Sequence, residues 1–146
     1  MSEPVKKTNI LIVDSVSQNY PCFKAILDKL DQNLIFANSA EEALRQILQY
    51  DFSVILLDLD LPDMKGFETA QLLRAGENAS YAPIIFLRVN NQSELEVNQE
   101  NTTAAVNYIL KPINPLILYS KVKAFVDLFI TSTLGMNLQN VHFGQC

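Results

Sequence analysis

Five short apolar runs recur along the chain, separated by segments whose apolar residues have helical spacing. The runs cover residues 10–13, 34–37, 54–57, 84–87 and 106–110. Within each run the hydrophobicity is continuous rather than alternating, which is typical of strands buried on both faces of a parallel sheet. The second and fifth runs are less purely apolar, so we expect those two strands near the edges of the sheet.

The segments between the runs predict helices that cover the two faces of this sheet. Apolar residues at helical spacing follow Ser17, the expected N-cap of the first helix, and Ser39 with Glu42 forms a capping-box pattern for the second. The remaining helices are expected to end near Gly76, to cover 90–103 as a marginal fourth helix, and to run from about 114 to 130. Strand and helix alternate five times, which predicts a doubly wound α/β fold around a five-stranded parallel sheet.

The length and composition fit one folded domain with short ends. The chain has 146 residues, of which 49% are hydrophobic and 18% charged, enough to build a packed core. We expect residues 1–8 to be an N-terminal extension, 9–130 the domain, and 131–146 an uncharged tail or the start of a linker.

Several classes of function are disfavoured by residue counts. The net charge of −5 disfavours binding to nucleic acid, which needs clustered cations. A single His excludes a multi-histidine metal site, and four scattered Gly exclude the glycine-rich phosphate loops. Two Cys without a C-x-x-C pair suit a reducing compartment, and no run reaches the roughly 18 apolar residues of a membrane span. We therefore expect a cytoplasmic domain that binds neither membrane nor nucleic acid.

Charged residues directly follow four of the predicted strands. These are Asp14, Asp58, Arg88 and Lys111. The carboxyl ends of parallel strands meet at one edge of the sheet, so these two carboxylates and two cations should converge. A carboxylate cluster can hold Mg²⁺, and a lysine beside it can pair with a phosphate. The pattern predicts a phosphoryl-accepting or metal-binding acidic pocket.

Four segments at these strand ends carry a resemblance to a known family. ILIVD (10–14), VILLDLDLPDMKGFE (54–68), PIIFL (83–87) and AAVNYILKPINP (104–115) resemble the receiver domain of two-component response regulators, over about residues 8–130. The resemblance implies a flavodoxin-like (βα)5 fold, in agreement with the alternation of strands and helices. It also implies a phosphorelay receiver that is not an enzyme beyond Mg²⁺-assisted transfer of a phosphoryl group to itself.

The resemblance assigns a role to each matching residue. Asp58 would be the phosphoacceptor and, together with Asp14, a ligand of Mg²⁺. Asp60 would give its main-chain carbonyl to the metal, while the side chains of Asp60 and Asp63 are expected to be solvated. Lys111 would pair with the acceptor carboxylate and then with the phosphoryl oxygens, and its bond to the following proline is frequently cis in the family.

Tyr108 matches the family's aromatic switch, but two other positions depart from the pattern. Ser15 stands where a second acid is usual, which removes one charge and should weaken the binding of Mg²⁺. Arg88 stands where a Thr or Ser hydroxyl is usual. Its cation would replace the missing metal charge, clamp the phosphoryl group, form a resting ion pair with Asp58, or point to solvent, and the sequence leaves these four readings open.

The resemblance implies a histidine kinase or phosphotransfer protein as partner. A homodimer through the fourth helix, fifth strand and fifth helix is a further expectation. No output domain is recognised, so the chain is either a stand-alone regulator or a fragment of a larger protein such as a hybrid histidine kinase. The alternative function is a degenerate receiver that acts as a phosphorylation-independent interaction module. A flavin-binding protein is disfavoured because the loop DSVSQN (14–19) lacks glycine and the chain has no Trp.

Overall fold

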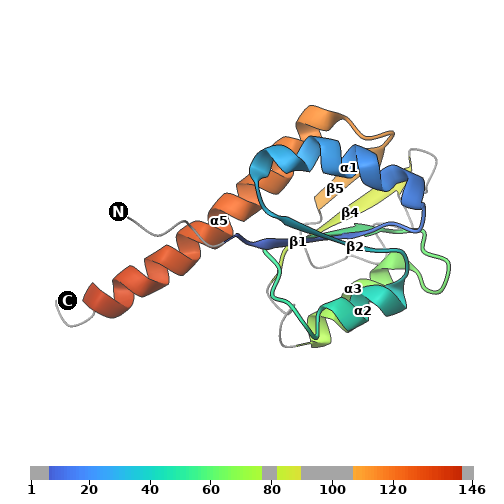
Figure 1. Cartoon of the computed structure of the whole chain (residues 1–146). Coiled ribbons are helices and arrows are strands. Elements are labelled where there is room, and N and C mark those ends of the chain that lie inside the picture. Colours follow the sequence, from blue (N-terminus) through green and yellow to red (C-terminus); the bar gives the residue numbers. More distant parts are fainter. Residues whose placement is uncertain (1–6, 77–81, 90–106, 143–146) are drawn as a thin grey trace.

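The computed structural model describes residues 7–76, 82–89 and 107–142, and of residues 133–142 only the backbone. Its strands are β1 (Asn9–Val13), β2 (Asn33–Ala37), β3 (Val54–Asp58), β4 (Ile84–Val89) and β5 (Asn107–Lys111). They pair in parallel in the order β2-β1-β3-β4-β5 (Figure 1). The predicted five-stranded parallel sheet is confirmed, with the second and fifth strands at its edges as expected.

Helices cover both faces of the sheet. They are η1 (Ser17–Asn19), α1 (Tyr20–Leu27), η2 (Asp28–Leu30), α2 (Ala40–Gln46), α3 (Gly66–Ala75) and α5 (Pro115–His142). The helices α1 and α5 lie on one face, and α2 and α3 lie on the other (Figure 1). The expected fourth helix falls outside the described residues.

Each face of the sheet has its own apolar core because successive strand side chains point to opposite faces. Leu11 and Val13 of β1 belong to the core under α2 and α3, while Ile10 and Ile12 belong to the core under α1 and α5. All four are fully buried. The apolar runs are therefore continuous because both sides of a strand face a hydrophobic layer.

One of the two predicted N-caps is confirmed and the other is wrong. The Ser39 hydroxyl accepts the N–H of Glu42 at 3.1 Å, as a capping box requires. Ser17 instead begins η1, and the N-cap of α1 is Asn19, without a side-chain capping bond. Pro21 in the first turn of α1 explains the later start, because its fixed φ favours the beginning of a helix.

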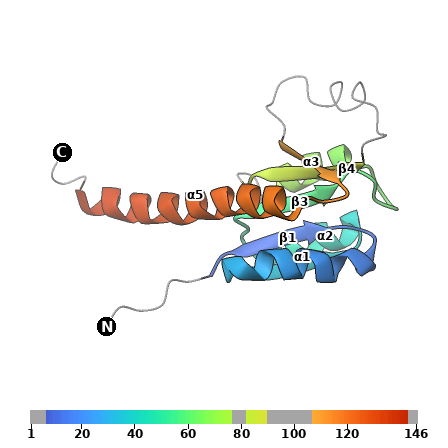
Figure 2. The same ribbon diagram turned by 90° about the horizontal axis from the view of Figure 1, so that it is seen from above.

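The last helix is longer than the sequence pattern suggests. It continues to His142 instead of ending near Ile130, and it runs past the edge of the sheet (Figure 2). Residues 131–142 contain no proline and one glycine, so nothing in them stops a helix strongly. No helix within the described residues is long and apolar enough to cross a membrane. The division into a domain and a separate tail stays a prediction.

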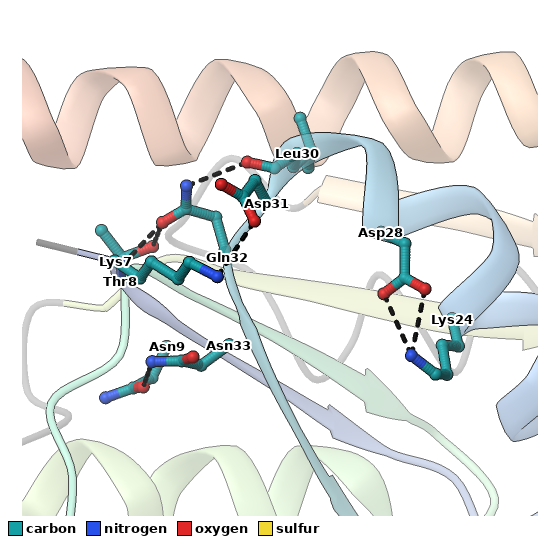
Figure 3. A network of polar contacts seen from close by, with 9 residues as sticks. All are labelled: Lys7, Thr8, Asn9, Lys24, Asp28, Leu30, Asp31, Gln32 and Asn33. Atoms are coloured by element: carbon teal, nitrogen blue, oxygen red, sulfur yellow. Dashed lines mark hydrogen bonds and ion pairs between the residues drawn. The ribbon is translucent and has the colours of Figure 1, made fainter. Parts of the chain in front are cut away.

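Polar contacts fix the amino ends of the strands (Figure 3). The amide oxygen of Gln32 accepts from the main-chain N–H of Thr8 at 2.6 Å and from its hydroxyl at 2.9 Å. The same hydroxyl lies 2.9 Å from that of Ser53, which is fully buried. Lys7 pairs with Asp31 at 3.0 Å. These contacts join β1 to the turn before β2, at the edge opposite the four charged strand ends.

Candidate functional site

Lys111 joins the two carboxylates at the carboxyl edge of the sheet. Its Nζ lies 2.7 Å from Oδ2 of Asp58 and 3.0 Å from Oδ2 of Asp14. Lys111 ends β5 and Asp58 ends β3, with β4 between them, so the lysine side chain reaches across one strand. The bond between Lys111 and Pro112 is cis. The structure thus brings together three of the residues singled out in the sequence.

This cluster is largely withdrawn from water. Asp14 is fully buried, Asp58 is 6% exposed, and the side chain of Lys111 is 19% exposed. Two carboxylates and one ammonium leave one net negative charge. Burying such ions costs several kcal/mol of desolvation each, which their attraction offsets only in good geometry. An arrangement this costly is more readily explained by chemistry at the site than by stability of the fold.

Opposing effects set the ionisation of Asp58 and Lys111. Burial raises the pKa of Asp58, while hydrogen bonds from Lys111 and from the Asp60 N–H pull it down, and the net direction is upward. Burial lowers the pKa of Lys111, but hydrogen bonds and attraction to Asp58 and Asp14 outweigh it and raise the pKa overall. Lys111 therefore remains a cation at neutral pH.

The loop after β1 surrounds Asp14 with hydrogen-bond donors. Oδ1 accepts the N–H of Val16 at 2.9 Å, and Oδ2 accepts the side-chain N–H of Asn19 at 3.0 Å. The hydroxyl of Tyr20 donates to the main-chain oxygen of Asp14 at 2.8 Å, and its ring stacks on Phe36. Sequence reasoning missed Asn19 and Tyr20. Their place a few residues after a strand-ending acid is the signal that could have found them.

The loop after β3 is held tightly at both ends. The N–H of Leu59 donates to the oxygen of Leu87 at 3.0 Å, and the N–H of Gly66 donates to the oxygen of Leu59 at 2.9 Å. Within the loop, the N–H of Asp60 donates to Oδ1 of Asp58 at 3.0 Å. Each oxygen of the Asp58 carboxylate therefore has a donor, one from the loop and one from Lys111.

Asp63 is a functional candidate that the sequence did not reveal. Asp63 is exposed, as expected for a solvated loop acid, but its two oxygens also accept the N–H groups of Ala40 and Glu41, each at 3.0 Å, at the start of α2. The N–H of Ala40 is the main cause that holds the pKa of Asp63 below its usual range. Asp60 is likewise exposed, as expected.

Arg88 lies against Tyr108. Its guanidinium carbon is 5.1 Å from the centroid of the Tyr108 ring, a cation–π distance. Its Nε is buried and has no hydrogen-bond partner among the described residues. Burial raises the pKa of Tyr108 and the nearby Arg88 cation opposes this, with a net upward direction. The structure shows no ion pair between Arg88 and Asp58, both of which it describes, so the resting ion pair is the one of the four possibilities that it does not support.

The carboxylates at this edge of the sheet suit a divalent cation that needs few protein ligands. No group of three or more His, Cys, Asp and Glu side chains that could hold a metal occurs in the described part of the chain. Mg²⁺ is often held by only one or two carboxylates, with water completing its octahedral shell. Asp14 and Asp58 supply two such hard oxygen ligands. The residues present therefore fit Mg²⁺, with few protein ligands.

Comparison with known sequences identifies relatives over most of the chain. Residues 10–123 match the family model of the response regulator receiver domain. Transcriptional regulatory protein YvrH of Bacillus subtilis (strain 168) is 34% identical over 121 residues, 82% of this chain and 49% of that protein. Aerobic respiration control sensor protein ArcB of Escherichia coli (strain K12) is 27% identical over 126 residues, 85% of this chain and 16% of ArcB. The chain thus spans half or less of the length of these relatives.

Solved structures share the fold. The receiver domain of sensor histidine kinase PA1611 from Pseudomonas aeruginosa PAO1, which has a magnesium ion in its active site cleft, superposes with a TM-score of 0.71 and 24% identity, over 83% of this chain and 98% of that one. A CheY-like receiver domain protein from Methanospirillum hungatei JF-1 gives 0.70 and 32%, over 84% and 95%. This chain therefore belongs to the response regulator receiver domain family and is homologous to the receiver domains of response regulators and histidine kinases.

Proposed function

We propose that Asp58 accepts a phosphoryl group from a histidine kinase or phosphotransfer protein, and that the product switches a protein-interaction surface. The observation that carries this proposal is the contact of 2.7 Å between the Lys111 ammonium and the buried Asp58 carboxylate. A fixed cation beside a buried carboxylate stabilises the negative charge of a transferring phosphoryl group.

The transfer requires one bond to form and one to break. A carboxylate oxygen of Asp58 attacks phosphorus, the P–N bond of the donor phosphohistidine breaks, and the imidazole nitrogen keeps the electron pair and takes a proton from solvent. Lys111 pairs with the phosphoryl oxygens as their charge develops. The Asp60 N–H, which donates to Oδ1 at 3.0 Å, limits rotation of the carboxylate. Bound Mg²⁺, held by Asp14, Asp58 and the main-chain carbonyl of Asp60, would supply further neutralisation of the phosphoryl charge.

Incubation of the chain with Mg²⁺ and acetyl phosphate, followed by intact mass spectrometry, tests this proposal. We expect one added phosphoryl group on the wild type and none on Asp58→Asn. Asp51→Asn is the matched control, because its side chain is exposed and lies at the opposite edge of the sheet. An unlabelled wild type that also binds no Mg²⁺ would contradict the proposal and favour the phosphorylation-independent interaction module.

Ser15 is proposed to weaken the site for Mg²⁺. Replacing Ser15 with Asp adds a carboxylate beside Asp14, so we expect the Mg²⁺ affinity to rise about tenfold, equal to about 1.4 kcal/mol. Calorimetric titration of the unphosphorylated chain with Mg²⁺ measures this directly. Ser132→Asp makes the same chemical change at an exposed position far along α5 and should leave the affinity near that of the wild type. Equal gains in both variants would mean that only net charge matters.

We propose that the charged guanidinium of Arg88 takes the place of the hydroxyl that the family usually has at this position. It follows Leu87, which is in register with Asp58 on the neighbouring strand. Its cation–π contact with Tyr108 links the end of β4 to the aromatic residue of the expected switch. The buried Nε lacks a partner in the described structure, and phosphoryl oxygens would give this donor an acceptor. We therefore keep two hypotheses for Arg88: it binds the phosphoryl group, or its cation replaces the missing metal charge.

Membership of the family and exposed apolar residues on β5 and α5 support the proposed partners. Leu110, Leu116 and Ile117 are 42%, 72% and 46% exposed on β5 and α5, which supports the proposed homodimer surface there. The similarity to part of hybrid signal transduction histidine kinase E of Dictyostelium discoideum supports a fragment of a hybrid histidine kinase, and a stand-alone regulator is the alternative. We also propose a cytoplasmic location, with no membrane and, given the net charge of −5, no nucleic acid as partner.

A further inference from the structure

Asp63 connects two parts of the molecule that are distant in sequence. It lies in the loop that follows Asp58, yet its carboxylate binds residues that precede it by 23 and 22 positions. Oδ1 accepts the N–H of Ala40 and Oδ2 accepts the N–H of Glu41, each at 3.0 Å. Because each oxygen has its own donor, the contact fixes the orientation of the carboxylate as well as its position.

The start of α2 already has a cap of its own. The hydroxyl of Ser39 accepts the N–H of Glu42 at 3.1 Å, and the Glu42 carboxylate accepts the N–H of Asn38 at 3.2 Å. A capping box of this kind is commonly sufficient to begin a helix. The two bonds to Asp63 are thus additional, and they are the ones that tie the helix to the loop after β3.

The same loop carries the donor that orients Asp58. The N–H of Asp60 reaches Oδ1 of Asp58 at 3.0 Å, and Asp60 also forms an antiparallel bridge with Lys65. Asp63 lies between the two bridged residues, at the outer part of the loop. Its attachment to α2 therefore restrains the segment whose conformation decides where the Asp60 N–H points.

We propose that Asp63 is a positioning residue of the phosphoacceptor site. By binding the start of α2, it holds the loop in the conformation in which the Asp60 N–H donates to Asp58 and orients that carboxylate for transfer. This inference rests on the proposed function. The negative charge of Asp63 also interacts favourably with the N-terminal end of the α2 dipole, which strengthens the attachment.

Two variants separate this role from simple helix capping. Asp63→Ala removes the bonds between loop and helix, whereas Ser39→Ala removes a capping bond of the same helix without touching the loop. Each is compared with the wild type by thermal melting, by hydrogen exchange of the Asp60 and Gly66 amides, and by the rate of phosphoryl uptake from acetyl phosphate. Asp63→Asn, which keeps one acceptor oxygen, is the conservative variant.

In Asp63→Ala we expect exchange of the Asp60 amide to rise about tenfold, the change that goes with loss of roughly one charge-assisted hydrogen bond. Phosphoryl uptake at saturating donor should fall by about the same factor, with half-saturation unchanged, since the loss affects orientation rather than binding. Asp63→Asn should lie between, and Ser39→Ala should lower the melting temperature while leaving the amide and the rate near wild type.

Equal effects of Asp63→Ala and Ser39→Ala on the Asp60 amide, or no effect of Asp63→Ala on it, would overturn the inference. A wild type that takes up no phosphoryl group would contradict the proposed function instead. Even then, the exchange of the Asp60 amide in the unphosphorylated chain decides whether Asp63 orders the loop.

Discussion

Replacement of Lys111 by alanine is expected to lower the free energy of unfolding by about 3 kcal/mol and to abolish phosphoryl uptake. The substitution leaves the buried carboxylates of Asp14 and Asp58 facing each other without their shared cation, and removing one partner of a buried ion pair typically costs 3–5 kcal/mol. The lower end of that range applies because the Lys111 side chain retains 19% exposure. Urea denaturation followed by circular dichroism measures the loss.

The loss should depend on pH. In the wild type, burial raises the pKa of Asp58 above its unfolded value, so this group favours folding most below the unfolded pKa, and the contribution disappears as pH rises through the folded pKa. Lys111 lowers the pKa of Asp58, so this pKa should be higher still in Lys111→Ala. The pH range in which protonated Asp58 favours folding then extends further toward neutral pH. The loss of unfolding free energy in Lys111→Ala, relative to the wild type, is thus expected to be largest near pH 7 and smaller near pH 5.

A surface lysine provides the control for Lys111. Lys123 pairs with Asp127 four residues later on α5, and both side chains are about half exposed. Solvent screens such pairs, so Lys123→Ala should change stability little at either pH. A Lys111→Ala variant as stable as Lys123→Ala, or a deficit that does not shrink on acidification, would contradict the role given to Lys111 in balancing the two carboxylates.

The strands could be predicted because they depend on the local pattern of apolar residues. A run such as 54–57 is apolar at every position since both of its faces are covered, and the run 106–110, which contains Asn107, corresponds to the edge strand β5. The run 34–37 is also apolar throughout, although it forms the other edge strand, β2. The meeting of Asp14, Asp58 and Lys111 was also predictable, because parallel topology alone brings the carboxyl ends of strands to one edge.

The contacts that the sequence did not reveal depend on tertiary packing. Asp63 binds a helix start more than twenty residues away, and no spacing rule links a loop acid to that helix. The direction of Arg88 is set by the Tyr108 ring on the neighbouring strand, which the sequence alone does not orient. The extension of α5 to His142 could not be predicted from the uncharged composition of residues 131–142, because such residues are typical of a tail but also permit a helix.

Substitution of Gly66 by alanine is expected to destabilise the fold by about 2–3 kcal/mol, the cost of forcing an extra group into a packed site. A Cβ at this position would lie 2.6 Å from the Cα of Leu59 and 2.7 Å from the main-chain oxygen of Asp58. Both are backbone atoms, so relief requires the start of α3 to move away from the end of β3. Thermal and urea unfolding measure the stability change.

Gly76→Ala is the matched control at the other end of α3. There the new Cβ would meet the terminal carbon of Ile47 at 2.9 Å, which a flexible side chain can relieve by rotating, so we expect a loss under about 1 kcal/mol. Similar losses of stability in both variants would show that the close approach of the backbone at Gly66 is not the cause of the loss in Gly66→Ala.

The shift of α3 in Gly66→Ala should also affect phosphoryl transfer to Asp58. The N–H of Gly66 donates to the oxygen of Leu59, and Leu59 joins Asp58 to the Asp60 N–H that orients the carboxylate. Moving α3 therefore disturbs the acceptor as well as the packing. We expect phosphoryl uptake in Gly66→Ala to fall even where the variant remains fully folded, and an unchanged rate in the folded variant would separate the packing of α3 from the geometry of Asp58.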